Sequence, residues 1–182
     1  MRKLLALFPI VFFLASCGDS SKIQDVVRQN VKDPGSAQFK DTIFSADNKR
    51  ACIVWNAKNG MGGYGDWDVA EIRKGNSEWT VKNMSGSKQN CSETGFKALD
   101  AGEKAEGDAR SKAIEILQKV KNISSKEAAE LGISGKCSGI VFNYAFYSKY
   151  VAEYRIRQDS GMLKRYEENL KEAKAKLDAG GC

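Results

Sequence analysis

The sequence predicts an α+β protein, with a small antiparallel sheet region followed by a helical region that ends in an antiparallel helix hairpin. Two periodicities predict this class. Between residues 42 and 83 the apolar residues tend to occur at every second position, which is typical of half-buried strands. Beyond residue 100 they recur at three- and four-residue steps, which is the pattern of helices that face a core.

The first unit is predicted to begin with an amphipathic helix over residues 22–31. A turn at Asp33-Pro34 ends it, because the proline ring pushes the preceding residue out of the helical region. The strands are then expected at residues 42–44, 51–56, 67–73 and 77–83. A tight connection at residues 74–76 joins the last two as an antiparallel hairpin. We expect three tryptophans to form the core: Trp55, Trp67 and Trp79.

In the helical region, one apolar stripe runs through residues 105–120, and a second helix is expected over residues 124–132. Ser124 and Glu127 have the spacing of a capping box at its start. Two further helices, residues 137–157 and 160–178, are joined by only a few residues, so they should pack as an antiparallel hairpin.

The hairpin selects one cysteine pairing among the three that four cysteines allow. Cys137 stands at the start of one long helix and Cys182 just past the end of the other, and both helices extend roughly 30 Å. These two cysteines should therefore form one disulfide, which leaves Cys52 and Cys91 for the other. An even number of cysteines is typical of an oxidising compartment.

Residues 1–16 have the pattern of a signal peptide. Arg2 and Lys3 make a positive start, and residues 4–15 are an apolar stretch interrupted only by Pro9. This stretch would extend about 18 Å as a helix, whereas a bilayer core of roughly 30 Å needs about 20 residues. It has no polar face, so a buried core helix fits less well than a signal that is removed.

The quartet Leu14-Ala15-Ser16-Cys17 resembles the lipobox of bacterial lipoproteins. In that family the signal is cut before the cysteine, which then carries a diacylglyceryl group and an acylated amine, with chains such as palmitate. The resemblance implies lipidation at Cys17 and a lipidated tether over residues 17–22. An aspartate directly after the cysteine favours the inner membrane in enteric bacteria. Gly18 occupies this position, so we expect the outer membrane, with the protein facing the periplasm.

Removal of residues 1–16 would leave 166 residues and lower the formal net charge from +6 to +4. This length suits one domain or two small ones. We place a small α+β sheet domain at residues 23–94 and the helical region at residues 100–182. The mild positive charge is compatible with anionic envelope surfaces, and an exported protein of this kind is expected to have no nucleic-acid partner.

The connection over residues 56–67 is a candidate binding loop. It contains four glycines within residues 60–65, which give the backbone conformational freedom. A mobile hairpin loop is the plain interpretation. The alternative is a ligand or partner site on a rigid sheet, with three contact residues: Met61, Tyr64 and Trp67. A phosphate loop is excluded because its lysine and hydroxyl positions are missing.

Two segments, DPGSAQF at residues 33–39 and NAKNGMGGYGDW at residues 56–67, resemble a recurring arrangement in small uncharacterised exported proteins of bacteria. There, a DPxSAxF turn precedes a cysteine-bearing strand and an NAKNxxGGY loop. The resemblance covers residues 23–83 and implies a small sheet domain, but it implies no activity.

The helix over residues 137–157 carries an aromatic band. Four tyrosines fall within about a third of its circumference: Tyr144, Tyr147, Tyr150 and Tyr154. Phe142 and Phe146 are expected on the opposite side. Burial on both sides is the simpler account, and an exposed patch that docks a partner is the alternative.

Catalytic chemistry has little support in the composition. The chain has no histidine, which removes the commonest general base and transition-metal ligand, and no cysteine pair has the close spacing of zinc sites. Ser85-Gly86-Ser87-Lys88 matches the penicillin-binding Ser-x-x-Lys motif without its companion motifs. Asp66, Asp68 and Glu71 are carboxylates that an exposed strand face explains. We therefore expect no enzyme activity, no cofactor and no metal.

The leading functional hypothesis is a non-enzymatic binding or interaction module in the periplasm, anchored to a membrane through Cys17. Its partner would be an envelope protein or peptidoglycan. One alternative is a protective lipoprotein that inhibits an incoming hydrolase or excludes superinfecting phage. A weaker alternative is hydrolysis of a cell-wall bond, which would require Asp66, Asp68 or Glu71 to lie in a deep cleft.

Overall fold

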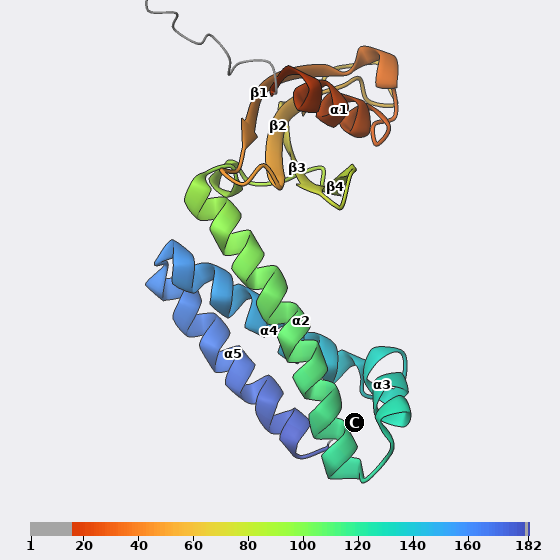
Figure 1. The fold of residues 1–182 in the computed structure, drawn as a ribbon, viewed down its shortest axis with the longest axis vertical. Helices are drawn as coiled ribbons and strands as arrows, with labels where there is room; N and C mark the ends of the chain where they lie inside the picture. The colour runs from red at the N-terminus through yellow and green to blue at the C-terminus, as the bar shows by residue number, and fades with distance from the viewer. Residues whose placement is uncertain (1–15, 181) are drawn as a thin grey trace, which may run out of the picture. The chain divides into compact units, whose positions relative to one another are not determined.

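The computed structural model describes residues 16–180 and 182 (Figure 1). The chain divides into two compact units, Met1–Cys91 and Ser92–Cys182. The predicted α+β class is confirmed, because a four-stranded antiparallel sheet precedes a helical region. The predicted signal peptide lies outside the described residues, except for Ser16.

Over residues 16–91, the described part of the first unit, there are one α-helix, two short 3-10 helices and four strands. Its elements are α1 (Ser16–Arg28), η1 (Pro34–Ser36), β1 (Gln38–Phe44), β2 (Arg50–Asn56), β3 (Asp68–Lys74), β4 (Trp79–Asn83) and η2 (Lys88–Asn90). The strands follow the order β1-β2-β3-β4, and all neighbours are antiparallel. All four predicted strands are present.

Strand β1 begins four residues earlier than residue 42, where the sequence pattern predicts its start. Gln38, Phe39 and Lys40 pair with β2, and the register then shifts between Lys40 and Thr42. Asp41 lies at this bulge with a φ of 51°. The extra residue breaks the alternation of side chains, so the first part of the strand has no visible period of two.

Helix α1 packs on the sheet (Figure 1) and contributes two buried residues to the core of this unit. Ile23 and Val27 are fully buried against sheet residues, which include Ile53, Ile72 and Trp79. Trp55 packs on the same cluster and is half-buried. The prediction that Trp67 joins this core is wrong. Trp67 precedes β3, and its side chain is 39% exposed.

Residues 17–22, which the lipobox resemblance implies to be a tether, belong to α1 in the structure. The helix therefore begins before the predicted residue 22, and it ends at Arg28 rather than at residue 31. Periodicity of apolar residues did not indicate this first part, because Gly18, Ser20 and Ser21 provide no apolar face.

The second unit is helical, with α2 (Glu93–Lys121), α3 (Ser125–Ile133), α4 (Ser138–Arg157) and α5 (Ser160–Asp178). Helix α2 packs against all three others, and α4 and α5 form the predicted antiparallel hairpin (Figure 1). The capping box of Ser124 and Glu127 is confirmed. Helix α2 begins well before residue 105, because Ser92 caps it by accepting a hydrogen bond from the Gly95 amide.

Both predicted disulfide pairs occur in the structure. Cys52 is joined to Cys91 with a Cα–Cα distance of 5.6 Å, and Cys137 to Cys182 with 5.0 Å. Each bridge lies within one unit. No helix among residues 16–180 is both long enough and apolar enough to cross a membrane.

Candidate functional site

The connection between β2 and β3, residues 57–67, is a loop with several internal hydrogen bonds, which we call the Met61 loop. Asn59 organises its tip: its side-chain oxygen accepts hydrogen bonds from the amides of Met61 (2.9 Å) and Gly63 (3.2 Å). The Asn59 amide donates to the Gly63 carbonyl at 2.8 Å. Gly62 has a φ of 81°, a conformation that glycine adopts without strain. The tip is therefore a closed turn held from within.

Ser36, in the turn before β1, braces the base of the Met61 loop. Its hydroxyl oxygen accepts a hydrogen bond from the Lys58 amide at 2.9 Å, and its carbonyl oxygen accepts one from the Tyr64 hydroxyl at 3.1 Å. Asn56 adds a bond from its side-chain nitrogen to the Gly65 carbonyl at 2.7 Å. The two segments that carry the sequence resemblance are thus in direct contact.

The Met61 loop exposes apolar and aromatic surface. Met61 is 94% exposed, Tyr64 46% and Trp67 39%. Lys40 places its ammonium 4.0 Å from the centre of the Trp67 ring, and Lys58 lies 5.9 Å from that of Tyr64. These cations stabilise the positions of the rings. Met61, at the tip of the turn, is in contact with solvent over nearly its whole surface.

The opposite end of the sheet holds the start of α1. The Asp19 carboxylate lies 3.0 Å from the ammonium of Lys74, at the end of β3, and accepts a hydrogen bond from Asn48 at 3.0 Å. The Lys74 bond is the main reason that the pKa of Asp19 falls from 3.8 to about 2, and Asn48 lowers it further. Cys17, the predicted lipidation site, lies two residues before Asp19 in the same helix.

The three candidate acidic residues differ in exposure and in hydrogen-bond partners. Asp66 is exposed in the Met61 loop, whereas Asp68 in β3 is half-buried, 3.4 Å from the Ser85 hydroxyl. Glu71 is only 9% exposed. Its carboxylate accepts hydrogen bonds from the Ser87 amide at 3.3 Å and from the side chain of Asn90.

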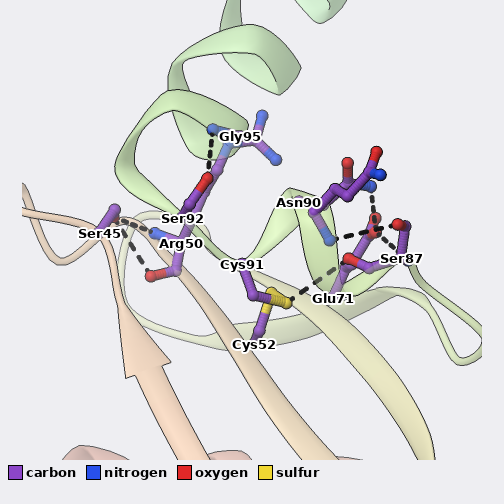
Figure 2. The surroundings of a disulfide bond; sticks show 10 residues. Ser45, Arg50, Cys52, Glu71, Ser87, Asn90, Cys91, Ser92 and Gly95 are labelled. Atoms are coloured by element: carbon purple, nitrogen blue, oxygen red, sulfur yellow. Dashed lines mark hydrogen bonds between the residues drawn. A yellow bond between two sulfur atoms is a disulfide. The ribbon is translucent and has the colours of Figure 1, made fainter. Parts of the chain in front are cut away.

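Figure 2 shows this Glu71 carboxylate beside the Cys52–Cys91 disulfide. Cys52 and Glu71 are directly paired across β2 and β3, and the 87–91 segment folds back to both of them. The Glu71 carboxylate therefore holds residues 87–90 beside β3 through these hydrogen bonds. Ser87, the third residue of the Ser-x-x-Lys match, caps η2 by accepting a hydrogen bond from the Gln89 amide.

The tyrosines of α4 fall into two groups. Tyr144 is 7% exposed and belongs to the core of the second unit. The other three predicted site residues, Tyr147, Tyr150 and Tyr154, are half-buried and lie 5.0 to 6.2 Å from the ring of Tyr166 on α5. Burial against α5 raises the pKa of Tyr154.

The prediction that Phe142 and Phe146 lie opposite the tyrosines is wrong for Phe146. Its ring centre is 4.7 Å from that of Tyr150 and 5.5 Å from that of Tyr147. Phe142, which is 51% exposed, stacks on Phe146. Residues 146 and 150 are four positions apart and so are neighbours on a helix. The aromatic side chains therefore form one continuous, partly exposed stack.

Several residues that shape these sites were not identified from the sequence: Ser36, Lys40, Asn59, Asp19 and Asn48. An asparagine before glycines is a recognisable turn signal, so Asn59 could have been found. The other four residues contact partners that are distant in the sequence, so no local sequence pattern marks them. Within residues 16–180 and 182, no group of three or more metal-ligating side chains is placed to hold an ion.

In comparisons with known proteins, no family model, no curated protein and no solved structure matches this chain.

Proposed function

We propose that this protein is a lipid-anchored binding module of the bacterial envelope that presents the Met61 loop to a protein partner. The observation that carries the proposal is the 94% exposure of Met61 at the tip of a loop that Asn59 and Ser36 hold in place. Methionine and aromatic residues are enriched in the cores of protein interfaces.

The hydrogen bonds and cation–ring contacts that restrain the loop support this function. A flexible loop loses conformational entropy when it binds, which costs roughly 0.5–1.5 kcal/mol for each immobilised side chain. The bonds from Asn59 and Ser36, and the cation–ring contacts of Lys40 and Lys58, reduce that cost. A non-enzymatic role agrees with the position of Glu71, whose carboxylate is used to hold residues 87–90.

The anchor in this proposal is the sulfur of Cys17. Three acyl chains, each methylene worth about 0.8 kcal/mol, are enough for stable attachment. Because Gly18 rather than aspartate follows Cys17, the proposed location is the outer membrane with the folded part in the periplasm. The binding loop and Asp19 lie at opposite ends of the sheet, and the six steps of a seven-residue strand such as β2 extend roughly 20 Å. The loop would therefore face away from the anchoring membrane.

Site-specific photo-cross-linking in intact cells tests this function. A photoreactive amino acid at Met61 is expected to capture one discrete protein, whereas the same group at Ser111, an exposed position of α2, is not. Capture of that protein should fall at least about fivefold when Asn59→Ala loosens the tip. Equal, diffuse adducts at both positions, or adducts with lipid alone at Met61, would contradict the proposal.

A protective inhibitor is the second candidate, and the exposed Met61 side chain at the tip of a hydrogen-bonded turn favours it. A braced turn with an apolar side chain at its tip is suited to fill a groove on another protein. The identity of the captured protein separates the two candidates. An incoming hydrolase or phage protein would indicate protection, whereas a resident envelope protein would indicate a structural or signalling interaction.

A further inference from the structure

An open basic groove of about 430 Å³ lies at the end of the sheet that holds Asp19. Four of its lining residues are cationic: Lys49, Arg73, Lys74 and Lys82. The others are Gly75, Asn76 and Thr80, so the lining contains neither a carboxylate nor a large apolar side chain. This composition suits an anion that is approached from solvent, rather than an apolar ligand.

Strand pairing explains how these cations come together. Arg73 in β3 is paired with Thr80 in β4, and Lys82, two residues further along β4, lines the same groove. The Lys49 carbonyl accepts a hydrogen bond from the Lys74 amide at 2.8 Å, which brings the β1–β2 turn beside them. The Lys49 ammonium lies 3.9 Å from the Asp47 carboxylate, and the Lys74 ammonium lies 3.0 Å from the Asp19 carboxylate.

The groove is close to the proposed anchor. Lys74 lines the groove and holds Asp19, and Cys17 lies two residues before Asp19 in α1. Two residues of helix advance by only about 3 Å. An acyl chain on Cys17 would therefore bring the groove to the level of the lipid headgroups.

We propose that this groove binds the phosphate groups of anionic phospholipids in the leaflet that holds the lipid of Cys17. The inference rests on the proposed anchoring, and it adds a second contact that orients the protein. Each basic residue near an anionic surface contributes about 1 kcal/mol. The first unit then stands on the membrane by one end of its sheet and directs the Met61 loop away from it.

The test uses the full lipidated protein, reconstituted in vesicles, with a photoreactive amino acid at Thr80. In vesicles that contain phosphatidylglycerol, Thr80 is expected to form lipid adducts, and Met61 is not. The double variant K49E/K82E should lower the Thr80 adduct roughly tenfold or more. The matched variant K126E/K171E has the same net charge, changes two exposed lysines of the second unit, and should leave the adduct unchanged.

Flotation of the vesicles separates the two proposals. Protein that floats but gives no Thr80 adduct, or equal adducts with pure phosphatidylcholine, overturns the headgroup contact and leaves the anchor standing. Protein that does not float overturns both. Saturable shifts of the Lys49 and Lys82 amide signals on addition of inorganic phosphate alone, without any dependence of the adduct on phosphatidylglycerol, would indicate a site for free anions and would also overturn the inference.

Discussion

The Tyr64 hydroxyl donates a hydrogen bond to the Ser36 carbonyl oxygen at 3.1 Å, which joins the turn before β1 to the loop after β2. The Lys58 amide strengthens the same connection through the Ser36 hydroxyl. The DPGSAQF and NAKNGMGGYGDW segments are therefore two halves of one structure. The first is a brace, and the second presents Met61.

Removal of the Ser36 hydroxyl should loosen the Met61 loop without unfolding the sheet. In Ser36→Ala the Lys58 amide loses its acceptor, and a typical hydrogen bond contributes about 1 kcal/mol. We expect that amide to exchange about fivefold faster in hydrogen-exchange NMR, with the amides of β2 unchanged. Ser21→Ala, at an exposed position of α1, is the control. Unchanged protection of Lys58 would show that Ser36 does not brace the loop.

Two glycines of α2 should respond in opposite directions to alanine. A Cβ at Gly102 would lie 2.5 Å from the buried side chain of Glu153 on α4, whereas one at Gly107 would meet nothing within 4 Å. Gly102→Ala should lower the free energy of unfolding by about 1–3 kcal/mol through overpacking. Gly107→Ala should raise it by up to about 1 kcal/mol through helix propensity.

Urea denaturation of the two variants measures this difference. A Gly102→Ala variant as stable as Gly107→Ala would mean that the Glu153 side chain is not fixed against Gly102 as the structure places it. The two changes have the same chemistry in the same helix, so differences in the unfolded state largely cancel.

How much of this could be predicted from the sequence depends on the range of each interaction. The capping box at Ser124, the four strands and the hairpin of α4 and α5 come from local patterns, and the hairpin in turn predicts the bridge between Cys137 and Cys182. The start of α1 could not be predicted in this way. The first turns of α1 are held by hydrogen bonds that the Asp19 carboxylate accepts from Asn48 and Lys74, which are 29 and 55 positions away in the sequence.

The Met61 loop shows the same division. Its glycines mark a loop, but they cannot distinguish a mobile loop from a braced one. The bond between Ser36 and Tyr64 connects residues 28 positions apart. The sequence placed Trp67 both in the core and among the contact residues of the loop, because a tryptophan beside a strand suits either position. In the structure Trp67 is 39% exposed, and Lys40 lies over one face of its ring.

Asp19 should contribute to stability in a defined pH range. Its folded-state pKa of about 2 is below the usual 3.8, so the ionised form stabilises the folded chain. This contribution is complete above about pH 4 and is lost as the pH falls towards 2. Asp19→Asn should lower the free energy of unfolding by roughly 1 kcal/mol at pH 7, and the gap from the unmodified protein should close between pH 4 and pH 2.

Denaturant titrations at several pH values test this, with Asp25→Asn as the control. Asp25 is in the same helix, and its pair with Arg28 is exposed, so its replacement should change stability by only a few tenths of a kcal/mol. A gap for Asp19→Asn that stays constant down to pH 2 would contradict the ion pair with Lys74.

The bridge between Cys137 and Cys182 should stabilise the second unit by about 4 kcal/mol in the chain-entropy model, because it closes a loop of 45 residues. Cys137→Ser/Cys182→Ser should therefore lower the midpoint of thermal unfolding. Amides in the last turn of α5 should exchange faster, since Cys137 is in the core and holds this end. Unchanged exchange there would show that packing alone fixes the hairpin.

The central claim is that Cys17 carries a lipid. The proposed orientation of the sheet, with the basic groove at the membrane and the Met61 loop away from it, depends on this anchor. Mass spectrometry of the intact protein, purified from bacterial membranes, tests it most directly. We expect a chain that begins at Cys17, with the added mass of a diacylglyceryl group and an acyl chain, and with four cysteines in two disulfides. A mass that retains residues 1–16, or an unmodified Cys17, would contradict the account.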